Sequence, residues 1–156
     1  GRAPGEIMSA LRLQMAGEDD IASLLTLMEP FNAFEQTPWE PIAKARALET
    51  LLKDPSLGVI GMFIALDRPV GCFVLAWGYD LEWNGRDAFL TELFLIPEAR
   101  GHGLGGQAMA LLESVAREQG ARALHLMVRH ENVGSRRRYD RQGYVSPPRI
   151  FLSKQL

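Results

Sequence analysis

The chain has 156 residues, of which 47% are hydrophobic and 23% charged, a composition typical of one soluble globular domain rather than of a disordered or fibrous chain. Seventeen Lys and Arg against 19 Asp and Glu give a net charge of -2, so no global charge favours nucleic acid or an anionic membrane. The longest apolar runs, such as Gly58 to Leu66, are far shorter than the roughly 20 residues of a membrane-spanning helix.

The cysteine content and the N-terminal residues indicate the redox environment of the protein and where its folded domain begins. A lone cysteine, Cys72, excludes an internal disulfide and any metal site with several thiolate ligands. Its strand-like neighbours predict a small buried residue rather than a reactive thiol, and we expect a reducing, cytoplasmic setting. Residues 1–7 precede Met8 and carry no apolar signal region, so we interpret them as an added tail and expect residues 8–156 to form a single domain.

Two helices are predicted in the N-terminal third. Gly17 to Asp20 provide capping and acidic first-turn residues, and apolar residues recur at helical spacing up to Pro30, which is a stop signal. Pro41 stands where a second helix would begin, and its apolar face continues to Leu52. An extra strand near Ala10 to Met15 would precede both helices.

Three strands are predicted next. Val59 to Leu66 and Val70 to Trp77 are rich in β-forming residues and flank a turn at Asp67, which indicates a hairpin. Ala88 to Ile96 then predicts a third strand that pairs antiparallel with the second. The three strands therefore form a meander.

The C-terminal half alternates helices and strands. Pro97 ends the third strand, and Arg100 to Gly106 lead into a third helix that Gly120 closes. The remaining elements are a strand at Ala123 to Val128, a helix at Ser135 to Gln142 and a last strand at Ile150 to Leu156. This order predicts an α+β fold, in which helices flank one mixed, mostly antiparallel sheet.

The densest chemical signal is the run Arg100-Gly101-His102-Gly103-Leu104-Gly105-Gly106, which follows a strand and opens a helix. Glycines let the backbone approach a phosphate, and the unpaired amides of a helix start supply a positive field. The same run satisfies the G-x-G-x-x-G pattern of dinucleotide-binding folds, which is a weak match alone. That pattern belongs to the first of several βαβ units, whereas here three strands and two helices precede it.

At this motif the chain resembles the GCN5-related N-acetyltransferase (GNAT) family, which uses acetyl-coenzyme A (acetyl-CoA). Arg100 to Gly105 fit the family's [RQ]-x-x-G-x-[GA] pyrophosphate loop, and Glu92 to Pro97 resemble the strand before it. The family's second signature, N-x-x-[AS]-x-x-x-Y-x-x-x-G-[FY], is matched by Asn132, Ser135, Tyr139, Gly143 and Tyr144. The resemblance covers residues 7–156 and implies a GNAT-like fold.

The resemblance also implies how acetyl-CoA is held. The pyrophosphate would bind the loop amides from Gly101 through Gly106, beside Arg100, His102 and Leu104. The backbone of Leu93, Phe94 and Leu95 would pair with the pantetheine arm as if it were another strand. Asn132 would either hydrogen-bond this arm or cap the following helix.

Two residues are predicted to be catalytic. Tyr139 matches the family tyrosine that protonates the departing thiolate, although it follows Arg138 where relatives have an apolar residue; the alternative is a half-buried helix tyrosine. Glu92 matches an acidic position near the acceptor amine. An alkylamine with a pKa of about 10 is protonated at neutral pH, so Glu92 would remove a proton through a water. The alternative for Glu92 is an outward-facing strand carboxylate.

Acceptor recognition is expected from the first two helices and the loop after the second strand. The candidates for an apolar or cation-binding wall are Phe31, Trp39 and Tyr79, with Phe34 and Trp83. Negative charge would come from Glu35, Asp80, Glu82 and Asp87. The stretch Glu82 to Arg86 resembles the hairpin of polyamine-type acetyltransferases, which implies a small cationic amine.

The resemblance thus implies an acetyl-CoA-dependent N-acetyltransferase that acts on a primary amine by direct attack in a ternary complex. Cys72 lies outside the motifs, which argues against a covalent enzyme intermediate. Two other classes stay open: a non-catalytic acyl-CoA-binding module of the same fold, and a nicotinamide-dependent oxidoreductase. Three scattered histidines give no metal site, and we expect neither nucleic acid nor membrane as a partner. Dimerisation is common among relatives, but the sequence identifies no interface.

Overall fold

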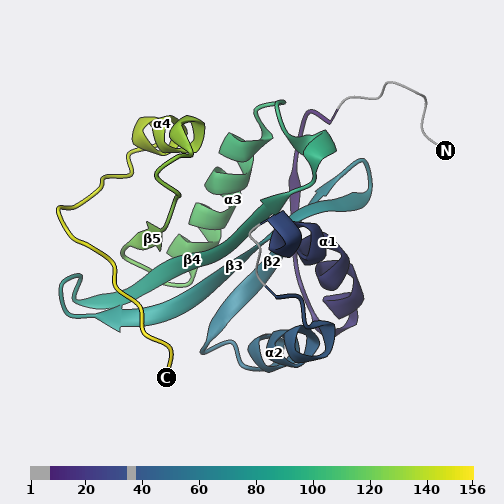
Figure 1. Ribbon diagram of the computed structural model, residues 1–156, viewed down its shortest axis with the longest axis horizontal. Coiled ribbons are helices and arrows are strands. Elements are labelled where there is room, and N and C mark those ends of the chain that lie inside the picture. The colour runs from purple at the N-terminus through teal and green to yellow at the C-terminus, as the bar shows by residue number, and fades with distance from the viewer. Residues whose placement is uncertain (1–7, 35–37) are drawn as a thin grey trace. The chain divides into compact units, whose positions relative to one another are not determined.

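The computed structural model describes residues 8–34 and 38–156 of the chain. The chain divides into two compact units, the first ending at Leu126 and the second spanning Met127–Leu156. The first unit contains the strands β1 (Arg12–Met15), β2 (Gly58–Ala65), β3 (Arg68–Asp80), β4 (Gly85–Leu95) and β5 (Leu124–Leu126), and the helices α1 (Ile21–Phe34), α2 (Pro41–Lys53) and α3 (Leu104–Glu118) (Figure 1). The second unit contains α4 (Val133–Arg141).

The five strands described in the first unit form one sheet in the order β1-β2-β3-β4-β5. The pairs β1–β2, β2–β3 and β3–β4 are antiparallel, and β4–β5 is parallel. A parallel pair needs a crossover connection, which α3 provides between β4 and β5 (Figure 1). The mixed sheet with flanking helices confirms the predicted fold class, and β1 confirms the extra strand expected near Ala10 to Met15.

The prediction that Pro30 ends the first helix is wrong, because α1 continues to Phe34 with Pro30 inside it. A proline inside a helix removes one backbone hydrogen bond and strains the preceding turn. Packing on both sides of Pro30 offsets this cost. Leu24 and Met28 are buried before it, and the ring of Phe31 packs 5.8 Å from that of Phe94 after it.

The prediction of a last strand at Ile150 to Leu156 is also wrong. The structure assigns no strand to this segment, and the side chains of Ile150 and Leu152 are exposed. A β-forming sequence becomes a strand only where a neighbouring strand pairs with it and gives its side chains a surface to pack on. The residues from Ile150 to Leu156 favour β-structure, but their sequence does not show whether a neighbouring strand is available to pair with them.

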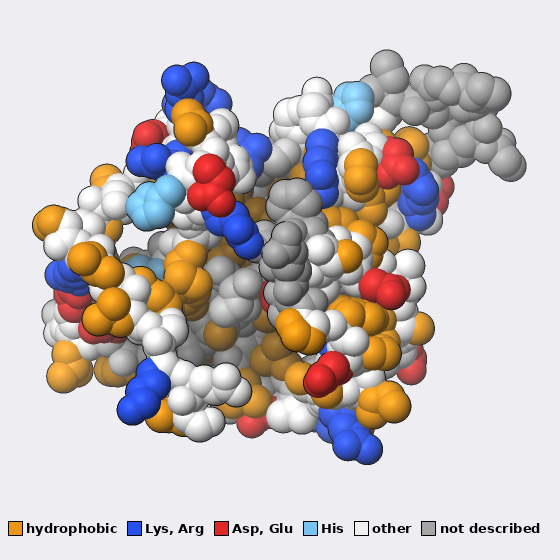
Figure 2. All heavy atoms as spheres, in the orientation of Figure 1, with side chains coloured by type: hydrophobic (Ala, Val, Ile, Leu, Met, Phe, Trp, Pro, Cys, Tyr) orange, Lys and Arg blue, Asp and Glu red, His pale blue; other side chains and the backbone are white. Residues whose placement is uncertain are grey.

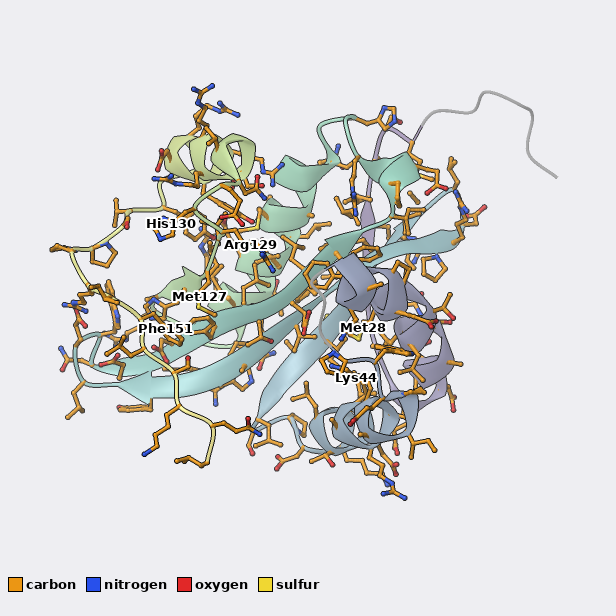
Figure 3. All side chains as sticks on the ribbon, viewed as in Figure 1. Met28, Lys44, Met127, Arg129, His130 and Phe151 are labelled. Carbon is orange, nitrogen blue, oxygen red and sulfur yellow. The ribbon has the colours of Figure 1, made fainter. Side chains whose placement is uncertain are left out.

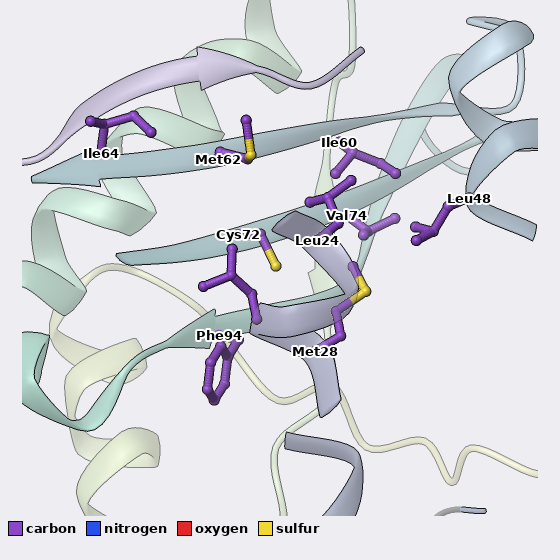
Figure 4. Close-up of a cluster of buried hydrophobic side chains, with 10 residues drawn as sticks. Leu24, Met28, Leu48, Ile60, Met62, Ile64, Cys72, Val74 and Phe94 are labelled. Atoms are coloured by element: carbon purple, nitrogen blue, oxygen red, sulfur yellow. The ribbon is translucent and has the colours of Figure 1, made fainter. Parts of the chain in front are cut away.

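One side of the sheet, the Cys72 face, carries Cys72 and Val74 of β3 and packs against α1 and α2. Its buried cluster consists of Leu24, Leu27, Met28, Leu48, Ile60, Met62, Ile64, Cys72, Val74 and Phe94. Figure 4 shows side chains of α1 and of the strands meeting in this cluster. Because side chains alternate between the two sides of a strand, the even-numbered residues 72 to 78 of β3 all point to this face.

The opposite side, the Phe73 face, carries Phe63 of β2 and Phe73 of β3, whose ring centres are 5.4 Å apart. Both rings are fully buried. The helix α3 lies on this side of the sheet, behind the strands in Figure 4, and buries Leu104, Met109 and Leu112. The apolar stripe of α3 therefore completes a second core.

Candidate active site

The glycine-rich run forms the turn between β4 and α3. A short 3-10 turn at Pro97–Ala99 leaves β4, and Gly101 and Gly103 then adopt left-handed backbone angles, with φ of 81° and 71°. Gly103 is the N-cap of α3, and Leu104, only 1% exposed, anchors the first turn of the helix. The first four amides of a helix have no partner within it. The turn thus presents a concentration of N–H donors beside exposed glycines.

Arg100 ties this turn to the end of β4. Its Nε donates a hydrogen bond of 3.0 Å to the carbonyl oxygen of Leu95, and its guanidinium carbon lies 5.7 Å from the centre of the Phe94 ring. A hydrogen bond and a cation–π contact together hold the guanidinium against the strand. Arg100 is therefore placed by Phe94 and Leu95, two residues that the resemblance assigns to the cofactor site.

A β-bulge interrupts β4 just before Glu92. Val74 of β3 pairs with Glu92, whereas the next residue, Leu75, pairs with Leu90. Thr91 is therefore an extra residue in β4, and its hydroxyl donates to the carbonyl oxygen of Val74 at 3.4 Å. A bulge bends its strand and changes which face the later side chains occupy.

The parallel ladder between β4 and β5 ends at the same place. Ala88, Phe89 and Leu90 pair with the three residues of β5, Leu124–Leu126, and the ladder goes no further. Residues 91–95 of β4 therefore continue past the end of β5. Backbone groups beyond the end of a ladder can pair with an added extended chain.

The structure brings some of the predicted acceptor residues together. Glu92 pairs with Val74 and so lies on the Cys72 face, where Phe31 and Trp39 pack at the border of the buried cluster. Tyr79 is an odd-numbered residue of β3, so it lies on the Phe73 face, 76% exposed. Tyr79 therefore lies on the opposite side of the sheet from Phe31 and Trp39, which does not support the prediction that the three residues form one wall of an acceptor site.

The predicted acidic residues differ in what they do. Asp80 accepts a hydrogen bond of 2.8 Å from the amide of Glu82, which shapes the turn before β4. Asp87 lies 3.0 Å from His125 through its Oδ2 atom. Glu35 lies outside the described residues, and Phe34 is the last residue of α1.

The pair of Asp87 and His125 is the site feature that the sequence analysis missed. Nε2 of His125 on β5 contacts the carboxylate, and the imidazole ring lies 6.1 Å from each of the rings of Trp83 and Phe89. Asp87 and His125 are 38 residues apart, so only the parallel register of β4 and β5 brings them together. Strand pairing of this kind leaves no local pattern in a sequence.

The second unit carries the family's second signature. Asn132 is the N-cap of α4, and its Oδ1 accepts from the amide of Ser135 at 3.2 Å, so it has the capping role that was one of its two predicted roles. The ring of Tyr139 packs edge-on against that of Tyr144, with 5.6 Å between the ring centres. The guanidinium carbon of Arg138 lies 5.6 Å from the centre of the Tyr139 ring. Figure 3 labels Met127, Arg129 and His130 on the segment that leads to α4.

Cys72 is fully buried in the core of the first unit. Burial and, to a smaller extent, the negative charge of Glu92 together raise the pKa of its thiol to about 12. A thiol that stays protonated is a poor nucleophile. The expectation of a small buried strand residue is therefore confirmed.

Three further properties of the part of the chain that the structure describes are its surface charge, its possible metal ligands and the hydrophobicity of its helices. Acidic and basic side chains are interspersed over the face drawn in Figure 2. Among the described residues, no three His, Cys, Asp or Glu side chains are grouped as metal ligands would be. Outside the gaps at residues 1–7 and 35–37, no helix combines the length and apolar character needed to cross a membrane.

The antiparallel meander, the parallel crossover and the glycine turn before α3 belong to a fold that solved structures named as possible or predicted acetyltransferases share. Residues 21–144 match the Acetyltransferase (GNAT) family. The chain belongs to this family, whose members are acyltransferases that use acetyl-CoA as donor. The family match includes the glycine run and therefore favours an acetyltransferase over the nicotinamide-dependent oxidoreductase.

Known proteins resemble this chain to different extents. It is 36% identical over 55 residues to YhfO of Bacillus subtilis (strain 168), named an uncharacterized N-acetyltransferase, but this match spans 35% of the chain and 37% of YhfO. An integron cassette protein from the mobile metagenome of Cole Harbour Salt Marsh is 30% identical, with a TM-score of 0.81, over 92% of this chain and 90% of that one. A predicted acetyltransferase from Clostridium acetobutylicum, solved with acetyl-CoA, is 15% identical with a TM-score of 0.75, over 93% and 96% of the two chains.

Proposed function

We propose that this protein transfers the acetyl group of acetyl-CoA to a primary amine of a small cationic molecule, by direct attack in a ternary complex. The observation that carries the proposal is the glycine turn at the start of α3, with Gly101 and Gly103 in left-handed conformations. A Cβ atom at either glycine would meet no atom within 4 Å, so the turn is open to a ligand. Its amides and the helix dipole suit a pyrophosphate.

The donor site extends from this turn along β4. Arg100, which is held by Leu95 and Phe94, would stand beside the pyrophosphate with His102 and Leu104. The backbone of residues 93–95, beyond the end of the β4–β5 ladder, would pair with the pantetheine arm. Asn132 belongs to the second unit, and the family signature is the ground for giving its side-chain Nδ2 a hydrogen bond to the pantetheine arm while its Oδ1 caps α4.

Tyr139 would protonate the departing thiolate. A phenol O–H can give its proton to sulfur as negative charge develops there. The packing of its ring against Tyr144 restricts its orientation, which suits a proton donor. Tyr139 belongs to the second unit, and its catalytic role is carried by the family signature.

Glu92 would take a proton from the acceptor amine through a water. It lies on the Cys72 face, the same face as Phe31 and Trp39, which would form an apolar wall for the acceptor. Tyr79, on the other face, would contact the acceptor only beyond the end of the sheet. The carboxylate and the aromatic rings together favour a cationic acceptor.

The test is thiol release from acetyl-CoA with a panel of primary amines that includes spermidine, and a tertiary amine as the negative control. We expect release with at least one primary amine.

Tyr139→Phe should lower kcat about 10- to 100-fold and leave acetyl-CoA affinity unchanged, while Tyr144→Phe, which removes a neighbouring phenol oxygen, should stay near wild type. Glu92→Gln should lower the rate most at low pH, where the amine is protonated, and the exposed Glu98→Gln serves as its control.

Tight binding of acetyl-CoA without thiol release across the panel would instead support a non-catalytic acyl-CoA-binding module. Unchanged turnover in both Tyr139→Phe and Glu92→Gln would remove the roles assigned to these two residues.

A further inference from the structure

His125 is held in one orientation by three contacts. Its Nε2 lies 3.0 Å from Oδ2 of Asp87, and the rings of Trp83 and Phe89 each lie 6.1 Å from the imidazole. The side chain of Asp87 is 15% exposed and that of His125 is 34% exposed, so the pair is shielded without being sealed from solvent. A carboxylate that orients an imidazole in this way is a common device in acid–base catalysis.

The contact also fixes the tautomer of the neutral ring. An ionised carboxylate can only accept hydrogen bonds, so the Nε2 atom that faces Asp87 must carry the hydrogen. The lone pair of the neutral imidazole is then on Nδ1. Nδ1 is therefore the atom at which His125 can accept a proton.

The bulge at Thr91 puts His125 and Glu92 on the same face of the sheet. Phe89 pairs with both Ala76 of β3 and His125 of β5, so His125 shares the Cys72 face with Ala76. Glu92 is three residues after Phe89, and in a regular strand an odd separation would place it on the opposite face. The extra residue restores it to the face of His125.

Acetyl transfer to an ammonium group removes two protons from the acceptor nitrogen. The ammonium carries three hydrogens and a secondary amide carries one, while the new N–C bond forms and the C–S bond of the thioester breaks. One of the two protons is balanced by the proton that the CoA thiolate receives, and the other leaves to solvent. Two protons thus leave the acceptor nitrogen, and a second acceptor beside Glu92 would let both leave without Glu92 first having to pass on the proton that it has taken.

We propose that His125, oriented by Asp87, is a second proton acceptor for the amine on the Cys72 face. This inference rests on the proposed function and adds to it a catalytic residue, His125, and a positioning residue, Asp87. Nδ1 of His125 takes one proton from the acceptor nitrogen and later releases it to solvent.

The first test is made on the free protein. Labelling with ¹⁵N and recording the imidazole nitrogens should show His125 as the Nε2–H tautomer when neutral, with His125→Gln and His130→Gln used to assign the signals. Asp87→Asn should lose this tautomer preference, because an amide can donate as well as accept. A neutral ring with its hydrogen on Nδ1 in the wild-type protein would overturn the proposal.

The second test is kinetic, with spermidine and acetyl-CoA as substrates. His125→Gln should lower kcat at least about 100-fold with KM within about threefold, and Asp87→Asn should lower kcat at least about tenfold. Free imidazole should restore part of the activity of His125→Ala, an effect that a structural role would not produce. His130→Gln is the matched control, and thermal unfolding of each variant shows that it is folded.

The outcomes separate this inference from the proposed function. An active wild type together with a folded His125→Gln variant of unchanged kcat overturns the role of His125 alone. A wild type that releases no thiol with any amine of the panel overturns the proposed function and this role with it.

Discussion

Burial and a neighbouring negative charge both raise the pKa of the Cys72 thiol. Its thiol is enclosed between α1 and the sheet, and both burial and the nearby Glu92 raise its pKa to about 12. Both effects penalise the thiolate, since burial removes its hydration and Glu92 repels its charge. A sulfur in this position contributes to packing and is excluded from chemistry at neutral pH.

Cys72 should accordingly not react with Ellman's reagent in the native protein at pH 8, and it should react with one equivalent of reagent in guanidinium chloride. The same shift links stability to pH. The folded thiol keeps its proton up to about pH 12, whereas the unfolded thiol ionises near its ordinary pKa of 9.0. Stability from this group is therefore complete below pH 9 and falls as the pH rises towards 12. Rapid reaction of the native protein would show an accessible thiol and reopen a covalent route.

At the scale of elements, both ends of α3 depend on left-handed backbone. Gly103 caps its N-terminus with φ of 71°, and Gly120 follows its C-terminus with φ of 84°. An L-residue with a side chain pays roughly 1–2 kcal/mol to adopt such a conformation. The two glycines carry the same conformational demand, but only Gly103 lies in the proposed pyrophosphate turn.

Gly103→Ala and Gly120→Ala form a matched pair for this reason. Both should lower the midpoint of thermal unfolding by a similar amount, because each forces alanine into the left-handed region. Only Gly103→Ala should also weaken acetyl-CoA binding, measured by isothermal titration calorimetry. Equal affinity in the two variants would mean that the turn does not hold the donor.

Local signals in the sequence predicted most of these elements. Pro41 begins α2, Gly120 follows α3 and the glycine run forms the βα turn, because each depends on the conformational preferences of a few adjacent residues. Pro30 inside α1 shows the limit of such signals, since its cost is offset by packing of Phe31 on β4. The exposed segment of Ile150 to Leu156 shows the same limit for strands.

The candidate site was predictable only where it is contiguous in sequence. The motif from Arg100 to Gly106 and the position of Glu92 could be found in this way, because a phosphate turn and the strand before it are local. The Asp87–His125 pair could not, since it depends on the register of two parallel strands joined through α3. The separation of Tyr79 from Phe31 depends on strand alternation along β3, which becomes visible once the register is known.

At the scale of the whole molecule, ligand binding should couple to the stability of the folded chain. A ligand that binds only the folded state stabilises it, by about 2.7 kcal/mol when its concentration is 100 times Kd. For a chain of this length that corresponds to a rise of roughly 5–10 °C in the unfolding midpoint.

Acetyl-CoA should therefore raise the midpoint of thermal unfolding, and NAD and NADP should leave it unchanged. Differential scanning fluorimetry of the full chain with each compound makes the comparison directly. Free CoA serves as a control that retains the pyrophosphate and lacks the acetyl group, and it should stabilise the protein as well. Stabilisation by a dinucleotide alone would contradict the assignment of the turn.

The extra residue in β4 also affects how this protein is aligned with its relatives. Before Thr91 the even-numbered residues of β4 lie on the Phe73 face, and after it they lie on the Cys72 face. The extra residue shifts the alternation by one. A gap-free alignment to a strand without that residue would match positions on the Cys72 face with positions on the Phe73 face on one side of it. Substitution patterns along β4 should therefore be compared in two blocks, separated at Thr91.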